Sequence, residues 1–125
     1  MNLELPEYYL NWVSSLDVED SICYEGKDWY LYSQEELMEE TTIDSQTTPN
    51  YLQLQSFLNT QREVIGEAPL SNKEAMECIT IGENNGDPLF YIPKENTLWC
   101  YYVDGGDIEK ISDSLQSFVE ESVVE

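Results

Sequence analysis

Residues 79–92 read ITIGENNGDPLFYI, and this stretch decides the fold class. Two apolar runs flank six residues, 82–87, of the kinds that turns require. Glycine permits a positive φ, and Asn and Asp tolerate the left-handed region. We therefore predict a hairpin connection between two antiparallel strands. Gly82, Gly86 and Asp87 are interpreted as structural turn residues, with contact to a ligand as the less favoured role.

Two further features extend this hairpin into a meander. Strand-like runs begin at residue 76 (MECITI), 88 (PLFYI) and 97 (TLWCYYV), and turn-rich segments separate them. This spacing indicates antiparallel strands rather than βαβ units. Ser112 or Asp113 can then cap a closing helix.

The first half of the chain predicts helices and one short hairpin. Pro6 suits the first position of a helix, and residues 21–32 form a hairpin pattern. Ser33 and Glu36 have the spacing of a capping box, which starts a short helix. Residues 41–50 and 66–74 are predicted as loops, and the segment between them as a helix, although its LQLQ alternation leaves a strand open. The prediction is one α+β domain, residues 1–125, with helices over one face of an antiparallel sheet.

The charge is extreme and uneven. The 125 residues carry 26 acidic and 5 basic side chains, a net charge of -21. Residues 17–44 hold ten of the acids against Lys27 alone, whereas residues 45–75 are nearly neutral. With 41% hydrophobic and 12% aromatic residues, a folded domain is favoured over disorder. Such a charge repels nucleic acid and anionic membranes and attracts a basic partner, although plain solubility explains it equally well.

The composition also disfavours several kinds of site. The chain has no histidine, which removes Ser-His-Asp and Cys-His nucleophile systems and the commonest transition-metal ligand. No CxxC, P-loop or EF-hand pattern occurs. We therefore expect no catalytic residue, no metal and no cofactor, and a protein that is not an enzyme.

The three cysteines and the N-terminus bear on location. Cys23, Cys78 and Cys100 are odd in number and set among apolar neighbours, which fits buried thiols in a reducing compartment. No signal peptide or run of membrane-spanning length is visible. We expect a cytoplasmic protein.

Several segments together resemble one family. ITIGENNGDPLFYI, the aromatic run LWCYYV, the turn DGGD and the closing SLQSFVEE are similar in order to the SUKH superfamily. LPEYYLNWV and LYSQEELMEE resemble its opening segments, and the most specific piece is Ile81, Gly82, Gly86 and Asp87. Residues 14–17 depart from the Asn-Gly pair that the family often has there, and residues 41–75 do not match it. The superfamily includes Smi/Knr-type glucan-synthesis regulators, Syd and many bacterial immunity proteins.

The resemblance implies an α+β fold and a function in binding other proteins. The first hypothesis is an immunity protein that neutralises a basic, nuclease-type toxin by binding it. The alternatives are a regulatory or scaffold module of the cell-wall-regulator type, an acidic DNA mimic, and last a small-molecule-binding domain or enzyme. The candidate partner-binding residues are acidic or aromatic side chains: Glu35, Glu36, Glu39, Glu40, Asp44, Trp99, Tyr101, Asp104 and Asp107. For the aromatic members, packing under the helices is the slightly favoured alternative.

Overall fold

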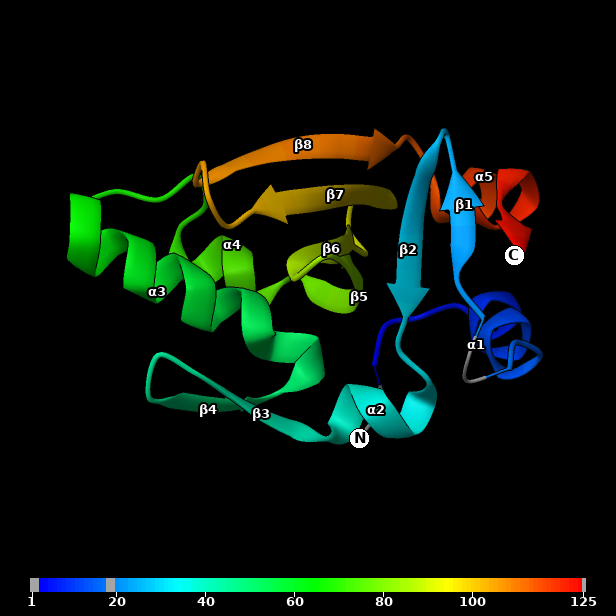
Figure 1. The fold of residues 1–125 in the computed structure, drawn as a ribbon, viewed down its shortest axis with the longest axis horizontal. Coiled ribbons are helices and arrows are strands. Elements are labelled where there is room, and N and C mark those ends of the chain that lie inside the picture. The colour runs from blue at the N-terminus through cyan, green and yellow to red at the C-terminus, as the bar shows by residue number, and fades with distance from the viewer. Residues whose placement is uncertain (1–2, 18–19, 125) are drawn as a thin grey trace.

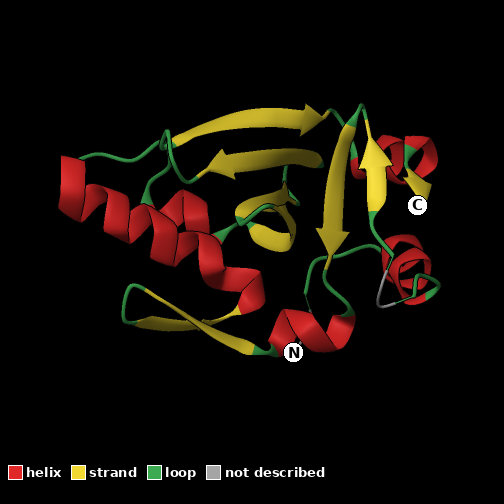
Figure 2. Ribbon diagram, in the orientation of Figure 1, coloured by secondary structure: helices red, strands yellow, loops and turns green. Residues whose placement is uncertain are grey.

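The computed structural model describes residues 3–17 and 20–124 and shows an α+β protein (Figures 1 and 2). The first elements are α1 (Glu7–Ser14), β1 (Ile22–Tyr24), β2 (Lys27–Leu31), α2 (Gln34–Met38), β3 (Glu40–Ile43), β4 (Gln46–Pro49) and the 3₁₀ turn η1 (Asn50–Leu52). The remaining elements are α3 (Gln53–Ile65), α4 (Asn72–Met76), β5 (Ile79–Asn84), β6 (Asp87–Ile92), β7 (Thr97–Tyr102), β8 (Asp107–Ser112), α5 (Leu115–Glu121) and β9 (Val123–Val124). The predicted fold class, with an antiparallel meander covered by the N-terminal and C-terminal helices, is confirmed.

Seven strands form one antiparallel sheet in the order β8-β7-β6-β5-β2-β1-β9, and β3 and β4 form a separate hairpin. The meander β5–β8 is continuous in sequence and in space. In Figure 1, β7 and β8 run across the view while β1 and β2 run nearly at right angles to them. The sheet therefore twists strongly along its width.

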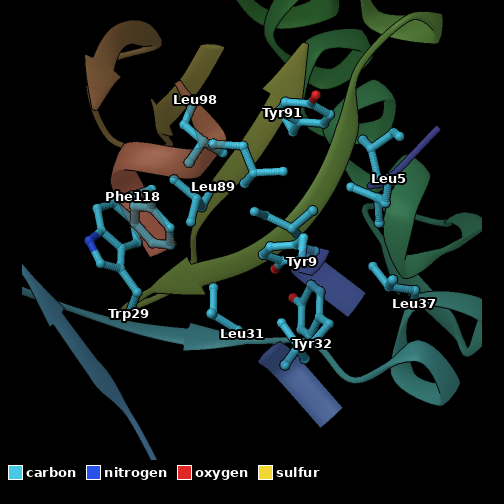
Figure 3. Packing of buried hydrophobic residues seen from close by; sticks show 14 of the residues in the cluster. Leu5, Tyr9, Trp29, Leu31, Tyr32, Leu37, Leu89, Tyr91, Leu98 and Phe118 are labelled. Atoms are coloured by element: carbon cyan, nitrogen blue, oxygen red, sulfur yellow. The ribbon is translucent and has the colours of Figure 1, made fainter. Parts of the chain in front are cut away.

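Helices cover both faces of the sheet, which corrects the expectation of one covered face. Because side chains alternate along a strand, β6 points Leu89 and Tyr91 toward one cluster and Phe90 toward another. The larger cluster includes Tyr9 of α1 and Phe118 of α5; part of it is drawn in Figure 3. The smaller cluster lies under α3 and α4 and contains Leu54, Leu58, Ala75, Cys78, Phe90 and Tyr101.

The connection between β5 and β6 is shorter than predicted. Asn84 pairs with Asp87, so only Asn85 and Gly86 lie outside the ladder. Their φ angles of 50° and 89° are both positive, which is the pattern of a type I′ hairpin turn. The Asp87 carboxylate accepts a hydrogen bond from Val103 N (3.0 Å) and so ties this hairpin to the end of β7.

Gly82 is not a turn residue. It lies inside β5, next to a register shift, and pairs with Leu31 of β2. A Cβ atom at this position would stand 2.2 Å from the backbone oxygen of Tyr30. Glycine is required here because two backbones approach closely, and positive φ plays no part.

The loop predicted for residues 41–50 is mostly the β3–β4 hairpin. Its strands are rich in Thr, a β-branched residue, and the Oγ1 atoms of Thr42 and Thr47 lie 2.9 Å apart across it. Asp44 and Ser45 make its turn, with φ angles of 51° and 68°.

Three other boundaries differ from the prediction. The segment 66–74, predicted as a loop, contains the start of α4, because Ser71 and Glu74 form a capping box. Strand β8 occupies residues that were given no strand, and α5 is capped by Ser114 rather than by Ser112 or Asp113. Ser112 is instead buried and accepts a hydrogen bond from the Tyr24 hydroxyl (3.2 Å).

Within the described ranges, no helix has both the length and the apolar character needed to cross a bilayer. The longest helix, α3, has 13 residues.

Candidate functional site

Most of the predicted acidic residues near α2 and the β3–β4 hairpin are exposed, whereas Glu36 is hydrogen-bonded within the fold. Three of them are exposed: Glu35 on α2, Glu39 at the C-cap of α2, and Glu40 at the start of β3. Asp44 lies at the far tip of the β3–β4 hairpin. Glu36 is half-buried: its carboxylate accepts hydrogen bonds from Ser33 N (2.9 Å) and from the Tyr30 hydroxyl (2.5 Å). Glu36 therefore holds the start of α2 and is engaged within the fold.

The two predicted aromatic residues point toward α3 and α4, which favours the packing alternative. Tyr101 is only 2% exposed, so little of its side chain is open to direct contact with a partner. Trp99 is half-buried; its indole N–H donates to Thr97 Oγ1 (2.9 Å), and the Lys110 ammonium lies 5.8 Å from its ring centroid. The reason is the alternation of β7, which turns residues 99 and 101 toward the face that α3 and α4 cover.

Asp44, Tyr101 and Asp104 meet at one end of the molecule. They line a surface hollow of about 300 Å³ between the C-terminal half of α3, the β3–β4 tip and the β7–β8 turn. We name it the α3-end hollow and define it by the residues that line it: Asp44, Phe57, Thr60, Gln61, Val64, Ile65, Tyr101, Val103, Asp104, Gly105 and Gly106. Asp107 is exposed at the first position of β8, beside this turn, and does not line the hollow.

Hydrogen bonds fix the wall of the α3-end hollow. Gln61 accepts from the Tyr101 hydroxyl (2.6 Å) and donates to the carbonyl oxygen of Gly106 (3.0 Å), so it ties α3 to β7 and to the β7–β8 turn. Thr60 Oγ1 donates to Asp44 Oδ2 (3.0 Å) and holds the hairpin tip against the same helix. Burial, and secondarily the Asp107 carboxylate, raise the pKa of Tyr101, which keeps its hydroxyl a donor.

The apolar part of the hollow was not predicted. Val64 and Ile65 follow Phe57 and Leu58 by seven residues each, so they continue the buried face of α3. That spacing predicts burial, yet Val64 is 75% exposed and Ile65 is 60% exposed. Figure 1 shows the reason: the C-terminal end of α3 extends past the β7–β8 turn, beyond what the sheet covers. The apolar spacing along α3 can therefore be read from the sequence, but the sequence does not show where the sheet that would cover these residues ends.

The cysteines are unpaired thiols, and two are deeply placed. Burial raises the pKa of Cys78 and of Cys100 to about 12, so both stay protonated at neutral pH and neither is an activated nucleophile. Over residues 3–17 and 20–124, no group of three or more His, Cys, Asp or Glu side chains is arranged to hold a metal ion.

Comparisons of the chain with protein-family models, with curated proteins and with solved structures find no match. The features that bear on function are therefore the residues and geometry of this chain.

Proposed function

We propose that this chain is a non-enzymatic protein-binding domain, an immunity protein that neutralises a basic, nuclease-type toxin by binding it and covering its active surface. The resemblance of its motifs to the SUKH superfamily suggests the class. The physical support comes from the excess of carboxylates and from the hydrogen-bond partners of the Lys and Arg side chains.

The observation that carries the proposal is that the acidic side chains remain unneutralised. Across the described part of the chain there is one ion pair, between Lys110 and Asp113 (3.2 Å), and it is exposed. Lys27 donates to the Tyr102 hydroxyl (2.9 Å), and Arg62 donates to the side chains of Asn59 and Asn72. These two cations are thus hydrogen-bonded to neutral groups. A surface of this kind has favourable long-range attraction for a cationic macromolecule.

A nuclease must hold an anionic substrate, so its active surface is basic and complementary in sign to this chain. A folded, rigid and acidic partner can occlude that surface without catalysing any reaction. Location in the cytoplasm belongs to the same proposal, and the unpaired thiols of Cys23, Cys78 and Cys100 support it.

The test is co-expression with a candidate toxin encoded beside this chain, together with an assay of the purified proteins. We expect cells to survive, and nuclease activity to fall in proportion to added protein until one equivalent is present. The control is an unrelated protein of similar net charge, which is expected to protect only in large excess. Cells that die despite soluble expression of this chain, or a toxin that is chemically altered by it, would contradict the proposal.

A further inference from the structure

The α3-end hollow has an apolar patch that stays exposed among the residues the structure describes. Val64, Ile65 and Val103 are 75%, 60% and 42% exposed, and they come from two segments far apart in sequence. Beneath them lie Phe57 and Tyr101, whose ring centroids are 6.0 Å apart. Interfaces are organised in this way, with an apolar centre that a partner desolvates and a polar rim around it.

The rim of this patch is negative from three sources. Asp44 and Asp104 belong to different turns and both line the hollow. The third source is the C-terminal end of α3, at Ile65, where the last carbonyl groups of a 13-residue helix carry partial negative charge. Such a rim repels an acidic occupant and attracts a cationic one.

The nearest base on the helix, Arg62, is hydrogen-bonded away from the hollow. Arg62 donates to Asn59 Oδ1 (3.1 Å), to Asn72 Oδ1 (2.8 Å) and to the Leu70 carbonyl oxygen, so its guanidinium is held toward the loop before α4. No Lys or Arg is among the described residues that line the hollow. A cationic partner would therefore meet no competing positive charge among these lining residues.

We propose that the α3-end hollow receives one apolar side chain of a basic segment in a protein partner, with flanking Lys or Arg residues reaching Asp44 and Asp104. This inference rests on the proposed function, since it names where the basic partner docks. The volume of about 300 Å³ is at the small end of the range for ligand pockets, about 300–1,000 Å³, which suits a side chain better than a cofactor. The wall that Gln61 and Thr60 fix lowers the entropic cost of docking.

The first experiment uses two synthetic peptides and NMR. One peptide is acetyl-Gly-Lys-Lys-Leu-Lys-Lys-Gly-amide, and the other has serine in place of its leucine. We expect the leucine peptide to bind at least about tenfold tighter, because burial of the leucine is favourable. Its amide chemical-shift changes should concentrate at residues 60–65 and 101–106. Equal affinity for both peptides, or shifts spread over the acidic surface without these residues, would overturn the proposal.

Matched variants then separate the apolar and charged parts of the hollow. Asp44→Asn with Asp104→Asn should weaken both peptides, whereas Glu120→Gln with Glu121→Gln on α5 removes the same charge at the opposite end of the molecule (Figure 1). Val64→Ser with Ile65→Ser should abolish the preference for leucine. Its control is Val123→Ser with Val124→Ser, which alters valines that are 63% and 47% exposed in β9. All substituted side chains are exposed, so the variants are expected to fold, and circular dichroism checks this. Control pairs that weaken binding as strongly as the hollow pairs would overturn the proposal.

The same variants distinguish this inference from the proposed function. If the unaltered chain protects cells from the toxin and the Val64→Ser, Ile65→Ser variant protects equally well, the docking site is wrong and the function stands. If the leucine peptide binds in the hollow but the chain gives no protection, the toxin-neutralising function is wrong and the docking site stands.

Discussion

At the scale of single residues, glycine has two different roles in the β5–β6 hairpin. Gly86 adopts a positive φ, and a side chain added there would have open space around it. Gly82 is needed because a side chain at this position would clash with β2, which approaches β5 closely. The two positions resemble each other in the sequence because both stand beside turn-forming residues. Only the pairing of β5 with β2 separates them.

This difference predicts different effects of alanine. Gly82→Ala should lower the free energy of unfolding by about 1–3 kcal/mol, because the new Cβ would meet the Tyr30 backbone oxygen and the strands must separate. Urea unfolding measures the loss. Hydrogen exchange locates it: the amide of Tyr32, which donates to the Ile81 carbonyl (2.8 Å), should lose protection.

Gly86→Ala is the matched control. It should cost about 1–2 kcal/mol through the left-handed backbone alone and leave the Tyr32 amide protected. Loss of Tyr32 protection in both variants, or in neither, would contradict the assignment of separate roles.

At the scale of elements, serine capping boxes start two short helices. Ser33 with Glu36 begins α2, and Ser71 with Glu74 begins α4. Both have the same S-x-x-E spacing, yet only the first was predicted, because residues 66–74 carry Gly, Pro and Asn that indicate a loop. The capping hydrogen bonds formed despite that composition.

The α4 capping box predicts a pH dependence. Hydrogen bonds from the backbone and then the side chain of Ser71 lower the pKa of Glu74. A lowered folded-state pKa means that the ionised group stabilises α4 above its ordinary pKa and that this contribution is lost as pH falls through the lower folded value. An NMR titration should show the pKa of the Glu74 carboxyl below the ordinary value of 4.5 for glutamate.

Ser71→Ala should move that titration back toward 4.5, and Glu74→Gln should remove this component of the pH dependence of α4 exchange. Substitution of Ser33 serves as the control, because it affects α2 alone. A Glu74 pKa that is the same with and without the Ser71 hydroxyl would show that the backbone N–H of Ser71, and not its side chain, lowers it.

Gln61 links different elements of the fold through its side chain. It joins α3 to β7 and to the β7–β8 turn through two hydrogen bonds. Gln61→Ala should cost about 1–2 kcal/mol of stability, because it leaves the Tyr101 hydroxyl and the Gly106 carbonyl without these partners. If the wall of the α3-end hollow is preorganised by Gln61, the leucine peptide should also bind more weakly to this variant. Calorimetry of both quantities would show whether stability and binding are lost together.

At the scale of the whole molecule, the excess of carboxylates makes the chain repel itself. A net charge of -21 with one internal ion pair in the described residues destabilises the compact state at low ionic strength. Raising NaCl from 0.01 M to 0.5 M shortens the screening length several-fold, so Tm should rise by a few degrees, equivalent to about 1 kcal/mol. Scanning calorimetry measures this. The rise should shrink at pH 4, where carboxylates lose charge, and a Tm that is independent of salt at pH 7 would contradict the prediction.

The same charge predicts the kinetics of binding. If the carboxylates steer a basic toxin, the association rate constant should fall steeply as salt rises, while the dissociation rate changes less. Stopped-flow measurements over a salt series separate the two rates. A flat association rate would remove the acidic surface from the mechanism and leave only the contacts at the interface.

The sequence by itself determined the α+β class, the meander and the acidic surface, because strand alternation, turn residues and net charge are local or additive properties. It could not place Gly82 against β2 or bring Asp44 and Asp104 to the lining of one hollow. Those outcomes depend on which strands pair and where each layer ends. Val64 and Ile65 show this most clearly: their helical spacing predicts burial, and they are exposed because the sheet stops before the helix does.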